Sequence, residues 1–209
     1  NAANLALQTQ NLINISKGLN AENKPNTAQI QRAGTGDFTL AAKLLEGQNG
    51  EIVSNGALNL QGDVVNLDGA STSAKLLNIN TKTLSNVGGQ LIQTGDGDQS
   101  LVATETLDNT NGLIATNAAN LAIQTQKLIN QNGQLQHAGT GSFTLTAKVL
   151  EGQNGELISN GALNLQGDFV KLDGANTSAK LLNINTKTLS NVGGQLIQTG
   201  DGDQTLVAT

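Results

Sequence analysis

The chain has 209 residues, a net charge of −5 and no Cys, Met, Trp or Tyr, with only three Phe and one Pro. Charges this sparse form no basic stripe, which excludes nucleic acid as an expected partner. No apolar run reaches the ~18 residues that cross a bilayer, so we expect no membrane insertion. Aliphatic side chains alone can fill a core made of identical stacked layers, so the composition predicts a repeat protein.

The first fourteen residues return later in the chain. Residues 1–14 match residues 117–130 at an offset of 116. Extra residues within 15–28, a stretch that contains the only proline, Pro25, separate this match from the next one. Because lengthening a loop adds little to the cost of folding, we predict that 15–28 is a loop inserted at a corner that residues 131–133 close in the later copy.

The rest of the chain is a block and its duplicate. Residues 33–104 match residues 138–209 at a constant offset of 105, with nine mismatches among 72 positions. The replacements are mild, and Val64 against Phe169 is one example in which apolar character is kept. We therefore treat 1–209 as one segment of a single architecture.

A shorter pattern of about 21 residues recurs inside each block. It starts with an alternating apolar run, such as Phe38, Leu40 and Ala42, which has the two-residue period of a strand. A turn of the form L-x-[N/G]-x-x-G follows, and after it a further short alternation carries one large apolar residue, such as Ile52 or Leu91. The turn leucine usually comes five residues after the last large strand residue, but the spacing is seven where we place the turn at Leu67 and Leu172.

A single unit of this kind cannot bury its own apolar edge, so units must stack. We predict an all-β fold, a right-handed parallel β-helix of nine to ten rungs, each rung holding about 21 residues in three short strands. Leu60 and Leu165 should point inward. Asn86, Asn109 and Asn130 are candidates for a corner at which asparagines of successive rungs form a hydrogen-bonded ladder. Solvated loop asparagines are the alternative.

The run from Leu84 to Leu91, repeated from Leu189 to Leu196, resembles the haemagglutinin repeat of large bacterial exoproteins. The chain is similar in this respect to filamentous haemagglutinin adhesins and to CdiA-type effectors of contact-dependent growth inhibition. The resemblance implies a secreted, extracellular filament at the bacterial cell surface, exported through an outer-membrane two-partner-secretion transporter. It implies a stalk that holds a receptor-binding or toxic tip away from the cell, with a target-cell receptor as a further partner.

No catalytic, cofactor-binding or metal-binding residue is expected, and we predict that the chain is not an enzyme. Residues 95–98 and 200–203, both Gly-Asp-Gly-Asp, suggest calcium-binding turns, but one copy per block favours a structural turn. The single histidine, His137, has no partner base, and we predict that it lies on the surface.

Two other functions remain open. Parallel β-helices can carry carbohydrate-active enzymes, which need paired carboxylates. Asp63 and Asp68, repeated as Asp168 and Asp173, are the one close acidic pair in a rung. The second alternative is an adhesin surface that binds a receptor through the 15–28 loop.

Overall fold

The computed structural model describes residues 4–19, 23 and 26–208, and every regular element in that part of the chain is a strand. The strands are β1 (Leu5–Ile13), β2 (Gln29–Arg32), β3 (Phe38–Glu46), β4 (Glu51–Gln61), β5 (Val64–Asn66), β6 (Ser71–Ser85), β7 (Gln90–Gln93), β8 (Gln99–Asp108), β9 (Leu113–Thr116), β10 (Leu121–Ile129), β11 (Gln134–His137), β12 (Ser142–Glu151), β13 (Glu156–Lys171), β14 (Asn176–Ser190), β15 (Gln195–Gln198) and β16 (Thr205–Ala208).

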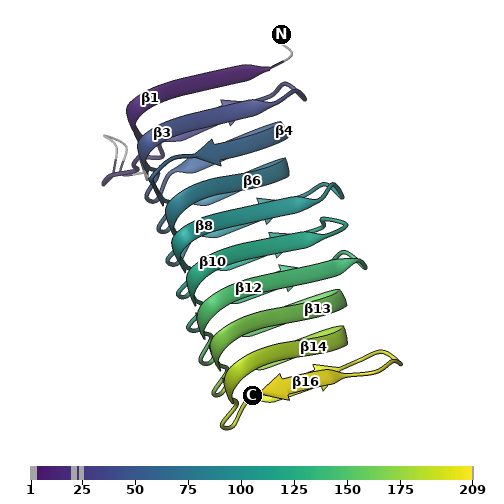
Figure 1. Ribbon diagram of the computed structural model, residues 1–209. Coiled ribbons are helices and arrows are strands. Elements are labelled where there is room, and N and C mark those ends of the chain that lie inside the picture. The colour runs from purple at the N-terminus through teal and green to yellow at the C-terminus, as the bar shows by residue number, and fades with distance from the viewer. Residues whose placement is uncertain (1–3, 20–22, 24–25, 209) are drawn as a thin grey trace.

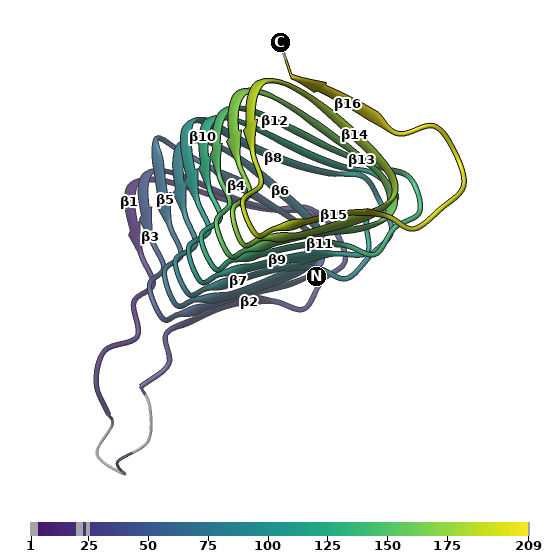
Figure 2. The same ribbon diagram turned by 90° about the horizontal axis from the view of Figure 1, so that it is seen from below.

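All strand pairs are parallel, and each joins one rung to the next (Figure 1). The register leads through nine turns from Leu7 to Leu206. The first turn, from Leu7 to Leu40, holds 33 residues because it contains the 15–28 segment, and each later turn holds 19 to 22. Figure 2, seen from the C-terminal end, shows the chain winding counter-clockwise as it approaches the viewer, which makes the helix right-handed. The predicted parallel β-helix is confirmed.

Each rung has three faces, but its strands often run through the corners between them. β6 and β14 each cover 15 residues without a break. In other rungs a loop at the second corner separates a four-residue strand, such as β7 or β11, from a longer bent one, such as β8. A register shift in that bent strand, beside Thr104, marks a β-bulge.

The core consists of stacked aliphatic side chains along the axis. Leu60 and Leu165 are 0% and 1% exposed, which confirms the predicted inward phase, and Ile52 and Leu91 on the short-strand face are fully buried as well. Each such side chain contributes roughly 1.5 to 3 kcal/mol by leaving water. Because each rung covers the next, the layers need little aromatic bulk.

The asparagine ladder is present at the first corner, the turn that follows the long strand. The Nδ2 of Asn86 donates to the Oδ1 of Asn109, and the Nδ2 of Asn109 donates to the Oδ1 of Asn130, both at 2.7 Å. All three side chains are fully buried. The fifth residue of the turn is left-handed, for example Asn111 (φ 55°) or Gly88 (φ 63°), which explains why only Asn and Gly stand there.

The ladder ends at the rung in which leucine replaces asparagine. The prediction that Leu67 opens the turn in this rung was wrong. Val65 pairs with Leu45 and with Leu84, so Val65 is the turn leucine's equivalent and the spacing from Leu60 is five. Leu67 therefore stands at the asparagine position. A Cβ on Gly47, at that position one rung earlier, would lie 2.9 Å from the Leu67 Cδ2, so the Leu67 side chain packs into the space that Gly47 leaves open. Leu172 and Gly152 repeat this arrangement.

The 15–28 segment leaves the body at the first corner, between β1 and β2 (Figure 2). The Oγ of Ser16 accepts the Ala28 N–H at 2.8 Å, and the Asn26 N–H donates to the Gly18 carbonyl at 3.2 Å. Pro25 lies outside the described residues. Between β10 and β11 a plain turn closes the same corner, with Asn132 at φ 53°.

Candidate functional site

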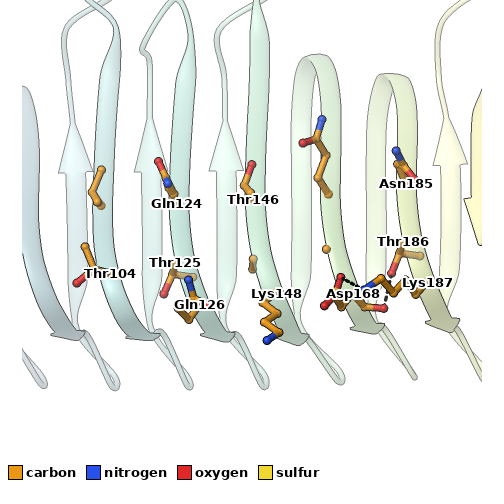
Figure 3. Close-up of a pocket in the computed structure, with 14 residues that line it drawn as sticks. Thr104, Gln124, Thr125, Gln126, Thr146, Lys148, Asp168, Asn185, Thr186 and Lys187 are labelled. Atoms are coloured by element: carbon orange, nitrogen blue, oxygen red, sulfur yellow. Dashed lines mark hydrogen bonds and ion pairs between the residues drawn. The ribbon is translucent and has the colours of Figure 1, made fainter.

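A groove of about 580 Å³ runs along the outside of the rod across β8, β10, β12, β13 and β14. Three columns of residues, one residue per rung in each, line it (Figure 3). The first wall consists of Val102, Gln124, Thr146, Gln166 and Asn185, the floor of Thr125, Ala147, Gly167 and Thr186, and the second wall of Thr104, Gln126, Lys148, Asp168 and Lys187. We call this surface the axial groove.

The floor is low because the strand bends at that column and the side chains of Thr125, Ala147 and Thr186 are buried. A Cβ on Gly167 would lie 2.2 Å from the Ala147 carbonyl oxygen, so no side chain fits there. Thr186 is 3% exposed, and its hydroxyl lies 3.1 Å from the carbonyl oxygens of Asp168 and Thr188. The floor is thus occupied by small residues whose polar atoms are used within the fold.

The amides of the first wall, by contrast, are free. Gln124, Gln166 and Asn185 have no side-chain hydrogen bond within the described part of the chain. Two residues away on the same outer surface, Asn164 accepts a 3.0 Å hydrogen bond from Asn183. These three groove amides therefore present unpaired donors and acceptors, whereas Asn164 and Asn183 of the neighbouring column bond to each other.

Charges alternate along the second wall. Lys187 forms a 3.0 Å ion pair with Asp168, drawn as a dashed line in Figure 3, while Lys148 has no ion-pair partner in the described protein. The first block repeats the pair between Lys82 and Asp63 at 2.9 Å, and the hydrogen bond and negative charge of Asp63 raise the pKa of Lys82. The lysine stays protonated at any physiological pH.

The Gly-Asp-Gly-Asp segments are held from inside by a buried glutamine. The Nε2 of Gln93 donates to the carbonyls of Gly95 and Gly97, and its Oε1 accepts the Leu77 N–H at 2.8 Å. Gln198 makes the same bonds to its own loop. These hydrogen bonds hold both segments in place as structural turns. Among the residues that the structure places, no cluster of three or more His, Asp or Glu could hold a metal ion.

His137 is not on the surface, and that prediction was wrong. It is 1% exposed, its Nε2 lies 3.0 Å from the Ala118 carbonyl oxygen, and its Nδ1 lies 2.9 Å from the Ser159 Oγ. The Gly161 N–H donates to that Oγ, so the hydroxyl proton is left for Nδ1 and Nε2 carries the ring proton. Burial lowers the pKa of His137, which keeps the ring neutral.

The signal that sequence reasoning missed is the position of polar residues directly before glycine-containing loops. The first-block counterpart of His137 is Arg32, which is 7% exposed and donates from Nη1 to the carbonyls of Gly34 and Gly36. Gln93 stands at the same inward place. A polar side chain there replaces water for the loop carbonyls, so its burial costs little.

The two aspartates of the acidic pair in each block have separate partners. Asp63 binds Lys82, whereas Asp68 accepts hydrogen bonds from the Ser85 hydroxyl and the Val87 N–H. In the second copy the Ser190 hydroxyl and then the Val192 N–H lower the pKa of Asp173. A catalytic acid needs a raised pKa, whereas the pKa of Asp173 is lowered.

Fold and surface together define the chain as a right-handed parallel β-helix repeat protein with an elongated polar groove. Comparisons with protein-family models, curated proteins and solved structures return no match. No helix among the placed residues is long and apolar enough to cross a membrane.

Proposed function

We propose that this chain is a structural spacer in a secreted bacterial filament of the filamentous haemagglutinin or CdiA type. The observation that carries the proposal is that the duplicated block holds a whole number of rungs. Five register steps lead from Ile79 to Ile184, which stand 105 residues apart. Duplication therefore lengthens the rod by about 24 Å at the strand spacing of ~4.8 Å and leaves its cross-section unchanged.

The remaining parts of the proposal come from the resemblance of the repeats to the haemagglutinin repeat of bacterial exoproteins. A filament of this type is exported through an outer-membrane two-partner-secretion transporter, stays at the cell surface and carries a receptor-binding or toxic tip. A parallel β-helix suits this role because each rung contacts only its neighbours, so stiffness and length add rung by rung.

Excision of residues 80–184 from the filament that carries this segment tests the proposal. The new junction joins Ile79 to Asn185 and leaves every remaining rung intact, because Asn80 and Asn185 are equivalent. We expect a rod shorter by about 24 Å that is still exported and still delivers its tip, with efficiency reduced only by reach. Small-angle scattering and a cell-contact assay measure the two effects.

The matched control removes residues 80–189, which joins Ile79 to Ser190 and leaves the joined rung five residues too short to keep the register. That variant should lose β structure and export. If the in-register variant is displayed and folded but no longer recognises target cells at all, the segment itself holds the recognition surface and the spacer proposal fails.

A further inference from the structure

We propose that the axial groove binds an extended, weakly acidic polysaccharide in which a carboxylate-bearing sugar alternates with a neutral one. This inference goes beyond the spacer role and does not depend on it. It rests on the shape of the groove, on its unpaired amides and on the order of its charges.

The shape requires a linear ligand that lies along the rod. The groove spans five rungs, from Val102 to Asn185, and no side chain interrupts its floor at Gly167, where a Cβ would clash with the Ala147 carbonyl oxygen. Successive wall residues are ~4.8 Å apart, close to the length that one pyranose ring adds to an extended β-linked chain. One sugar can therefore face each rung.

The unpaired amides require a ligand rich in neutral donors and acceptors. Gln124, Gln166 and Asn185 offer both N–H and C=O groups, and sugar hydroxyls satisfy both. A peptide strand is a poor alternative, because the backbone of this face already pairs with the rungs above and below and offers no free edge. A lipid or an apolar peptide would leave the amides without partners.

The order of the charges sets the pattern of the ligand. Lys148 and Lys187 stand two rungs apart, with Asp168 between them and paired to Lys187. A polymer with a carboxylate on every sugar would place one of its charges against Asp168. A polymer with a carboxylate on every second sugar can face Lys148, pass Asp168 with its neutral sugar and meet Lys187 with the next carboxylate.

Three hexasaccharide probes separate the possibilities by calorimetry and by NMR shifts of groove residues in the native chain. The probes, all β-linked, are alternating glucuronate and N-acetylglucosamine, all-glucuronate, and all-N-acetylglucosamine. We expect the alternating hexamer to bind most tightly, with shifts at Thr146 and Lys148. The proposal is overturned if the alternating hexamer does not bind at millimolar concentration or if the fully charged hexamer binds as well.

Two variants test the residues. Because Lys43, Asp63 and Lys82 repeat the charge order, both variants are made in a Lys43→Gln chain. Gln124→Ala with Gln166→Ala should weaken binding roughly fivefold to a hundredfold, since two net hydrogen bonds are lost.

The matched control is Gln134→Ala with Gln136→Ala, two glutamines of β11 that bond to each other on another face and whose loss should not change binding. Equal weakening by both pairs would show that the groove is not the site. Circular dichroism and the melting temperature confirm that the exposed substitutions leave the fold intact. Failure of every probe refutes the groove proposal and leaves the spacer test unaffected.

Discussion

Replacement of Asn109 by alanine, compared with the same change at Asn86, measures the energy of the corner ladder. Asn109 stands in the middle, where it accepts from Asn86 and donates to Asn130. Asn86 stands at one end, where Leu67 offers no donor and the Asn86 Oδ1 has no hydrogen-bond partner. The two positions therefore share a residue type, a depth of burial and a turn, and differ in the number of amide–amide bonds.

The structure gives different magnitudes for the two changes. Asn109→Ala removes two amide–amide bonds, worth about 1 kcal/mol each, and leaves the buried Asn130 Oδ1 without a donor at about 1 to 3 kcal/mol. It also removes the bonds from its Nδ2 to the Gly112 and Gln134 carbonyls, so we expect a loss of at least ~3 kcal/mol. Asn86→Ala removes one amide–amide bond and the matching bonds from its Nδ2 to the Gly89 and Leu113 carbonyls. It orphans the Asn109 Oδ1 but also eliminates the orphaned Oδ1 of Asn86, so its loss should be smaller than that of Asn109→Ala by about 2 to 4 kcal/mol.

Guanidinium denaturation gives the free energies of unfolding, and hydrogen exchange at the turn amides shows whether a loss is local. Local readout matters because long repeat arrays need not unfold in one step. An equal or larger loss for Asn86→Ala would refute the ladder reasoning.

Three further predictions concern single side chains. Thr177→Val should raise the free energy of unfolding by about 1 kcal/mol, because the buried Thr177 hydroxyl has no hydrogen-bond partner. Thr186→Val deletes a hydrogen-bonded hydroxyl and should lower the free energy of unfolding. A thermal melt in which Thr186→Val is the more stable of the two variants contradicts this. Because burial lowers the pKa of His137, the unfolded chain takes up a proton below about pH 6.5 before the native ring does. Stability should then fall as pH decreases through that range, less so in His137→Gln, and denaturant titrations at pH 7.5 and pH 5 with unchanged stability would disprove it. Gly167→Ala should lower the free energy of unfolding by several kcal/mol, because the new Cβ would contact the Ala147 carbonyl oxygen. Gly193→Ala, in open space at φ 67°, should lower it by only about 1 kcal/mol. Chemical denaturation of both variants decides the order.

The sequence predicted the strand phase well because alternation and stacking leave one inward solution. Leu60, Leu165 and the ladder asparagines all lie where the two-residue period and the turn pattern place them. The position of Leu67 was mistaken because a leucine at the corner looks like the leucine that opens a turn. The two kinds of leucine differ in what lies one rung earlier: Leu67 packs against Gly47, which has no side chain, and this contact exists only once the rungs are stacked.

The axial groove was not predicted, and the reason lies in how it is built. Its walls come from residues about 20 positions apart that meet only through the register, and its depth depends on a bend at the column of Gly167. A lone Gln124 or Lys148 carries no such signal. His137 was misplaced for a related reason, since its partners, Ala118 and Ser159, belong to the rungs before and after its own.

The register of the rungs also has a kinetic consequence. Beyond the β1–β3 pair, each strand pairs with one about 20 residues away, whether near Leu60 or near Ile184, so the average loop that must close does not grow as the rod lengthens. A new rung needs only a finished neighbour as its template, and the last formed edge always supplies one. A chain that leaves a narrow pore with its N-terminus first can therefore fold as it emerges, and each rung that locks outside opposes backward sliding.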